Sequence, residues 1–76
     1  MNQHAPSWDL FGTFLAVMRD GSLSSAARAL RVAQPTVRRQ IEDLEAALGT
    51  VLFTRSQAGL RPTAAATDLL PFAQAI

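Results

Sequence analysis

The side chains best suited to chemistry in this sequence are arginines, and they are concentrated in its middle. All seven basic residues are arginine, which an arginine-rich genome would also produce. Their distribution is more informative, because six arginines but only three acidic residues lie between Arg28 and Arg61, whereas the flanks hold three acids and one arginine. Guanidinium groups bind phosphates and guanine edges through paired hydrogen bonds. A basic middle between neutral or acidic ends therefore favours a nucleic-acid-binding surface.

The densest part of this region surrounds Arg38 and Arg39. Three uncharged residues precede the two arginines and three acids follow: Gln34, Pro35 and Thr36, then Glu42, Asp43 and Glu45. On a helix this order opposes the dipole, which prefers the reverse by about 0.3–1 kcal/mol per charge. Selection for contact with phosphates and guanines explains the order. The alternative is a solvated helix face with surface pairs at four-residue spacing, which contribute only a few tenths of a kcal/mol.

Hydrophobic spacing predicts three helices that would position these side chains. The first begins after a Ser7 cap and ends at Asp20-Gly21, and its apolar face holds Trp8, Phe11, Phe14, Leu15 and Met18. A short second helix is expected over 25–30, and the stretch Ser22-Leu23-Ser24-Ser25 offers two possible caps for it. After a break at 31–33, Gln34-Pro35 begins the third helix, which Gly49 ends. Its predicted buried face is Val37, Ile41, Leu44 and Leu48.

The pattern changes after residue 51. The runs 52–55 and 60–63, separated by the turn-forming stretch 56–59, predict a two-stranded hairpin in which Pro62 ends a strand or lies at an edge. Thr63 then caps a last helix, in which Pro71 should cause a kink or a local adjustment. One face of this helix holds Leu69, Phe72, Ala73 and Ile76 and has no evident partner in the chain. Either it pairs with a second copy or it folds back onto the core of its own chain. The apolar helical spacing continues to the last residue, as expected of a fragment.

The order helix, helix, helix, hairpin, helix is that of a winged helix-turn-helix. We therefore predict a mainly α fold with a three-helix core, a two-stranded β wing and a C-terminal linker helix. The predicted DNA-binding domain is 1–62, and 63–76 is the start of a truncated linker and dimerisation helix. In this fold the second helix of the motif, about 34–48 here, lies in the major groove of DNA, and the wing at 53–62 reaches the backbone or minor groove.

The sequence also resembles the N-terminal domain of LysR-type transcriptional regulators over residues 10–67. The resembling positions are Gly21-Ser22-Leu23-Ser24, Ala26-Ala27, Leu30, Gln34-Pro35-Thr36-Val37, Gln40-Ile41, Leu44-Glu45, Leu48-Gly49, Leu52-Phe53, Arg55 and 60–63. The resemblance implies a bacterial transcription factor that binds double-stranded DNA as a homodimer, with a small-molecule effector bound by a further domain that is not in this chain. Three positions depart from the family pattern: Ala33 replaces a capping serine or threonine, Arg38 replaces a serine or threonine, and Ala66 replaces a glycine.

The resemblance and the chemistry of the residues together define the candidate sites. The DNA-binding candidates are Ser22, Gln34, Pro35, Thr36, Arg38, Arg39, Arg55 and Arg61, and the dimerisation candidates are Leu69, Phe72 and Ile76. We expect Gln34 to contact an adenine edge or a phosphate, and Pro35 and Thr36 a thymine methyl. Arg38 would read guanine, unless it meets only phosphate. Arg39 and Arg55 would hold phosphates, with Ser22 at a position where the family contacts phosphate, and Arg61 would border the minor groove.

Several other classes of function are disfavoured. The chain has no cysteine, one histidine (His4) and no tyrosine, so an enzyme, a metal site and a cofactor are not expected. None of its apolar runs approaches the roughly 20 residues of a membrane span, and its first residues are not a secretory signal. We therefore expect a cytoplasmic protein. A protein–protein interaction module on the same scaffold is the alternative that remains.

Overall fold

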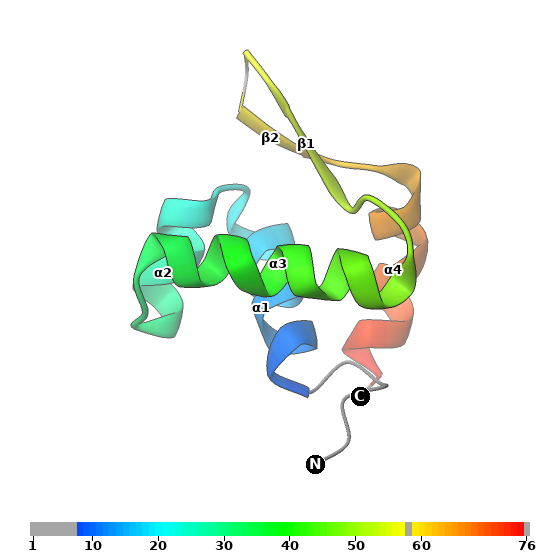
Figure 1. The fold of residues 1–76 in the computed structure, drawn as a ribbon, viewed down its shortest axis with the longest axis horizontal. Coiled ribbons are helices and arrows are strands. Elements are labelled where there is room, and N and C mark those ends of the chain that lie inside the picture. The colour runs from blue at the N-terminus through cyan, green and yellow to red at the C-terminus, as the bar shows by residue number, and fades with distance from the viewer. Residues whose placement is uncertain (1–7, 58, 76) are drawn as a thin grey trace.

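Four helices and one hairpin make up the computed structural model, which describes residues 8–57 and 59–75. In chain order they are α1 (Trp8–Asp20), α2 (Leu23–Leu30), α3 (Gln34–Leu48), β1 (Phe53–Ser56), β2 (Gly59–Pro62) and α4 (Ala64–Gln74). In Figure 1, α3 runs across the front of α1 and α2, α4 stands at the C-terminal end of α3, and the hairpin projects above them. The predicted winged helix-turn-helix is confirmed.

A single apolar core joins the three N-terminal helices to α4 and to the base of the wing. Its largest fully buried side chains are Phe14, Val17, Val37, Leu44 and Leu52. The aromatic ring of Phe14 packs against that of Phe53 at a centroid distance of 5.9 Å, which connects α1 to the first residue of the wing. The buried hydroxyl of Thr13 hydrogen-bonds the side-chain amide of Gln40, so the one buried polar side chain of the described core has a partner.

The ends of the second and third helices follow local capping chemistry. Helix α2 begins at Leu23 rather than at the predicted Ser25, because Ser22 is extended and its Oγ accepts a hydrogen bond from the Ser25 N–H at 3.1 Å. It ends at Leu30, and the residue that caps its C-terminus, Arg31, is a non-glycine residue in the left-handed region with φ 60°. Gly49 ends α3 in the same region, with φ 69°, as predicted. Ala33 makes no side-chain cap bond at the start of α3.

The buried face of α3 is shorter than the sequence predicted. Val37, Ile41 and Leu44 are buried, but Leu48 is 39% exposed. Leu48 is the last residue of the helix, and the Gly49 cap turns the chain away directly after it. The prediction that Leu48 continues the buried face is therefore wrong. Regular apolar spacing does not show how far along a helix its packing partners extend.

The wing is a two-stranded antiparallel sheet whose strands lie closer to the turn than predicted. They pair as Phe53 with Pro62, Thr54 with Arg61, Arg55 with Leu60 and Ser56 with Gly59. The predicted runs 52–55 and 60–63 are each displaced by one residue. Ser56 pairs with Gly59, which has φ 117°, and the Ser56 hydroxyl also donates to the Gly59 carbonyl at 3.1 Å. Pro62 ends its strand, as expected.

Helix α4 starts at its predicted cap but buries more of itself than predicted. The Thr63 Oγ1 accepts a hydrogen bond from the Ala66 N–H at 3.3 Å, and the helix continues through Pro71. Ala66 and Ala73 are buried in the core, and Leu69 packs against it. Part of the apolar face of α4 therefore packs on the core of the same chain, which is the second of the two possibilities that the sequence left open. Phe72 remains 73% exposed, and Ile76 lies outside the described residues.

The missing cap of α3 generates a prediction. Ala33 is exposed and has the extended backbone of a capping residue, with φ −71° and ψ 149°. The substitution Ala33→Ser supplies a side-chain acceptor for the N–H groups of the first turn, so we expect the free energy of unfolding to rise by about 1 kcal/mol. Urea denaturation measures this change. Ala29→Ser, at an exposed position inside α2, is the control and should not stabilise; an equal effect of both substitutions would contradict the capping explanation.

Candidate nucleic-acid interface

The outer side of α3 carries the polar side chains that the sequence placed there. Gln34, Pro35, Arg38 and Arg39 are exposed, and Thr36 is half-buried. Among residues 8–57 and 59–75, neither arginine forms an ion pair, so the pairs Arg38–Glu42 and Arg39–Asp43 that the alternative interpretation required are not formed. Both guanidinium groups are therefore available to an external anion.

Three stripes along α3 follow from its helical geometry, and they face different directions. With Val37, Ile41 and Leu44 turned inward, Pro35 and Arg39 lie four residues apart on the outermost stripe. The stripe on one side begins with Gln34 and Arg38 and continues to Glu45, which contacts the base of the wing. The stripe on the other side includes Thr36 and also Gln40, whose amide contacts Thr13 of α1.

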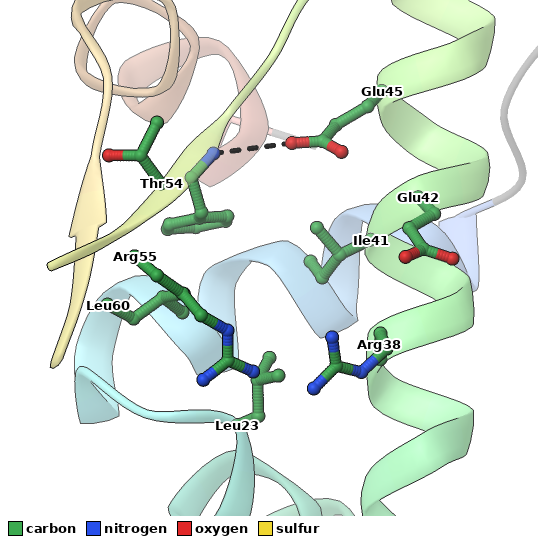
Figure 2. A pocket seen from close by; sticks show the side chains of 9 residues that line it. Leu23, Arg38, Ile41, Glu42, Glu45, Thr54, Arg55 and Leu60 are labelled. Atoms are coloured by element: carbon green, nitrogen blue, oxygen red, sulfur yellow. Dashed lines mark hydrogen bonds between the residues drawn. The ribbon is translucent and has the colours of Figure 1, made fainter.

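A groove separates the wing-facing stripe of α3 from the hairpin. Its charged lining residues are Arg38, Glu42, Glu45 and Arg55, and the apolar side chains of Leu23 and Leu60 lie beside them. Figure 2 shows the guanidinium groups of Arg38 and Arg55 pointing toward one another above Leu23. Two residues 17 positions apart in the sequence thus place positive charge in one hollow.

The groove continues toward the starts of α2 and α3. Arg55 also borders a second hollow, whose other polar lining residues are Ser22, Ser24 and Gln34. The N–H groups at a helix start attract anions, although the Ser22 Oγ is already engaged as the cap of α2. The structure therefore brings Ser22, Gln34, Arg38 and Arg55 together along one groove.

The two arginines of the wing do not share a face. Paired residues of an antiparallel ribbon lie on the same face, and successive residues alternate. Arg55 is paired with Leu60 and faces the groove, whereas Arg61 is paired with Thr54 on the opposite face. Arg61 is exposed but stands apart from the other candidates, which the sequence alone did not indicate.

Glu45 has a role that the sequence pattern did not indicate. Its position beside Glu42 and Asp43 suggested a solvated acidic face, whereas the Glu45 carboxylate accepts hydrogen bonds from the backbone N–H groups of Leu52 at 2.7 Å and Phe53 at 3.3 Å. Figure 2 shows the second of these bonds reaching from α3 to β1. The carboxylate thereby fixes the base of the wing to α3. Helical spacing could not indicate these two bonds, because they join residues seven and eight positions apart across the turn at Gly49.

Thr63 holds the same segment from its other side. Its hydroxyl donates to the carbonyl of Val51 at 2.7 Å, and its backbone N–H donates to the carbonyl of Leu52 at 2.9 Å. The N–H groups of this segment thus point to Glu45 and its carbonyls point to Thr63. The backbone that enters the wing is satisfied by groups from α3 and from the cap of α4.

Outside this interface, the described residues offer few other kinds of site. The described ion pair joins Arg19 to Asp20 at 2.9 Å, and the hydrogen bond from Arg19 holds the pKa of the Asp20 carboxyl below its usual value. No cluster of three metal-ligating side chains occurs within 8–57 and 59–75. None of the helices described is long and apolar enough to cross a bilayer. His4 lies outside the described residues.

The chain is similar to regulators of known family. Residues 8–67 match the family described as bacterial regulatory helix-turn-helix protein, lysR family. Over 57 residues the chain is 47% identical to the HTH-type transcriptional regulator ClcR of Pseudomonas putida, a match that covers 75% of this chain and 19% of ClcR. The chain thus spans about a fifth of the length of that relative.

Solved structures agree with the sequence comparison. The crystal structure of a complex between CbnR_DBD and DNA superposes with a TM-score of 0.86 at 39% identity, covering 91% of this chain and 79% of that one. The oxidized form of Corynebacterium glutamicum OxyR superposes with a TM-score of 0.90 at 29% identity, covering 99% of this chain and 23% of that one. The arrangement of the four helices and the wing is therefore shared with regulators of this kind.

The contacts of Glu45 generate a prediction. The substitution Glu45→Ala leaves two N–H groups at the base of the wing without their acceptor, so the free energy of unfolding should fall by about 1–3 kcal/mol. Glu45→Gln retains a neutral acceptor oxygen and should lose less. The exposed Glu42, one turn earlier on α3, provides the matched control, and Glu42→Ala should change stability by less than about 0.5 kcal/mol. Urea denaturation separates the three variants; equal stabilities of Glu45→Ala and Glu42→Ala would contradict the assigned role.

Proposed function

The chain belongs to the lysR family of bacterial regulatory helix-turn-helix proteins and is a sequence-specific DNA-binding domain of a transcriptional regulator; on this premise we propose which of its surfaces meet the duplex. The observation that carries the proposal is the outer side of α3. Its first turns present exposed arginines with no ion-pair partner among the described residues, beside a groove lined by Arg55 of the wing. A regulator that acts on bacterial DNA works in the cytoplasm, which is where we place it.

Helix α3 occupies the major groove with its N-terminal half. The outermost stripe, Pro35 and Arg39, enters the groove furthest, so we assign Arg39 to base edges rather than to the phosphate contact expected from the sequence. Pro35 and the half-buried Thr36 supply apolar contact to thymine methyl groups. Gln34, at the first position of the helix, contacts an adenine edge or the adjacent phosphate. The proposed base contacts thus come from side chains whose directions are set by the helical geometry of α3.

The wing and the start of α2 hold the DNA backbone. Arg55 faces the groove beside α3 and contacts phosphate, with Ser22 at the near end of the same groove. Arg61 projects from the opposite face of the ribbon, where it reaches the adjacent minor groove. These contacts set the register of α3 on the duplex without reading sequence themselves.

The last helix provides a surface for a second copy of the chain. We divide the chain into a DNA-binding domain at 1–62 and a linker helix that begins at Thr63. Phe72 is 73% exposed on α4, and pairing of two copies through this helix would bury it together with the outer edge of Leu69. Because the chain spans about a fifth of ClcR, the regulator's effector would bind in another part of the protein.

Sequence-specific binding has a direct test. Selection of bound duplexes from a random pool should enrich an inverted repeat whose half-sites lie about one helical turn apart. Fluorescence anisotropy of the enriched duplex should show affinity that falls steeply with salt, with a slope near −0.9 for each neutralised phosphate. No enrichment, together with weak and salt-insensitive binding, would instead favour the protein–protein interaction module.

The dimer surface has an independent test. Sedimentation at micromolar concentration should show association that depends on concentration, and Phe72→Ala should weaken it because the exposed ring is removed. Val51→Ala is the control, since Val51 is 55% exposed but lies between α3 and the wing. A strict monomer at every concentration, or equal effects of the two substitutions, would exclude pairing through α4.

A further inference from the structure

We propose that Arg38 and Arg55 together bind one backbone phosphate of the DNA strand that passes between α3 and the wing. Arg38 then contacts phosphate and does not read guanine, the other role that the sequence left open. This inference rests on the proposed function and deepens it, because it assigns a joint ligand to residues from two different elements. That ligand is a phosphodiester group with a single negative charge.

The Arg38 side chain points toward the wing. Arg38 lies on the stripe of α3 that faces the wing, one turn after Gln34 and two turns before Glu45, which bonds the base of β1. Its guanidinium group points into the groove beside α3 (Figure 2), not along the outermost stripe that holds Pro35 and Arg39. A side chain in the groove between α3 and the wing meets the DNA backbone, whereas base edges lie ahead of the outermost stripe.

Two like charges converge in the groove. Arg38 and Arg55 line the same hollow, and their guanidinium groups point toward one another. Within the described residues neither guanidinium group has an ion-pair or hydrogen-bond partner. Two cations that face each other repel, and a single anion between them removes that repulsion while it gains charge-assisted hydrogen bonds from both. The planar, multiply donating guanidinium is suited to a phosphate oxygen pair.

Two acidic side chains in the groove indicate which end of it the phosphate occupies. Glu42 and Glu45 line the hollow one and two turns beyond Arg38, and their carboxylates would repel an anion. In the other direction the groove leads past Arg55 to Ser22, Ser24 and Gln34, which carry no negative charge. The strand therefore runs from the Arg38–Arg55 pair toward the starts of α2 and α3, and away from Glu42.

The test combines charge-removing variants with single neutral phosphates in the DNA. The duplex enriched by the wild-type chain is prepared as a set, each carrying a methylphosphonate at one position of a half-site. Arg38→Ala and Arg55→Ala should each weaken binding to the unmodified duplex about tenfold. At one and the same methylphosphonate position both losses should nearly vanish, because the shared charge is already gone. Arg19→Ala, which removes an exposed arginine on α1, is the control and should leave affinity within about twofold.

The same variants are also measured on duplexes with single base changes. Arg38→Ala should weaken all of them by the same factor. Relaxed preference at one base pair, with a loss that persists on every methylphosphonate, would overturn the proposal and make Arg38 a base reader. If the affinity losses of Arg38→Ala and Arg55→Ala vanish at two different methylphosphonate positions, the two arginines do not share a phosphate. If Arg38→Ala weakens binding no more than Arg19→Ala does, Arg38 does not contact the DNA. A wild-type chain that selects no duplex would instead refute the proposed function itself.

Both substitutions are at exposed positions, so the variants should fold. Circular dichroism and the thermal midpoint of each variant establish this before binding is measured. Arg38→Gln provides a second variant that keeps most of the side chain and removes only the charge. It should reproduce the loss seen for Arg38→Ala, because the phosphate responds to charge; retention of full affinity by Arg38→Gln would overturn the proposal.

Discussion

The position of the wing depends on how the backbone between α3 and β1 is satisfied. This segment leaves a helix at Gly49 and enters a strand at Phe53. The N–H groups of Gly49 and Thr50 still bond the Glu45 carbonyl, whereas residues 51 and 52 lie beyond the helix and before the strand. Glu45 accepts from two of its N–H groups, and Thr63 bonds two of its carbonyls. Since unpaired backbone groups are costly when shielded from water, these bonds from Glu45 and Thr63 hold the base of the hairpin beside α3.

That anchoring also explains part of the charge order on α3. Acidic residues in the second half of a helix oppose its dipole, and the sequence alone suggested that DNA contact was the whole reason for this order. For Glu45 the reason is the wing, whose N–H groups the carboxylate binds. For Arg38 and Arg39 in the first half, no internal partner exists among the described residues, and the explanation by an external anion remains.

The anchored wing in turn decides what the arginines do together. Arg55 faces α3 and Arg61 faces away because they belong to adjacent residue pairs of one ribbon, whose side chains lie on opposite faces. A hairpin shifted by one residue would exchange their directions, since side chains alternate between faces. The strand register and the contacts of Glu45 and Thr63 therefore produce the groove that Arg38 and Arg55 share. This groove also separates the proposed phosphate-binding position on α3 from the proposed base-reading positions.

The sequence by itself determined the local features of this protein. Caps at Ser22 and Thr63, the left-handed Gly49 and the apolar spacing of Val37, Ile41 and Leu44 all act over a few residues, which is why the helices, the hairpin and the family resemblance were predictable. Only the tertiary structure decided the bonds of Glu45, the exposure of Leu48, the packing of Leu69 and the opposite directions of Arg55 and Arg61. These depend on which element lies beside which, and that arrangement is set by contacts between segments distant in the chain, for which periodicity carries no signal.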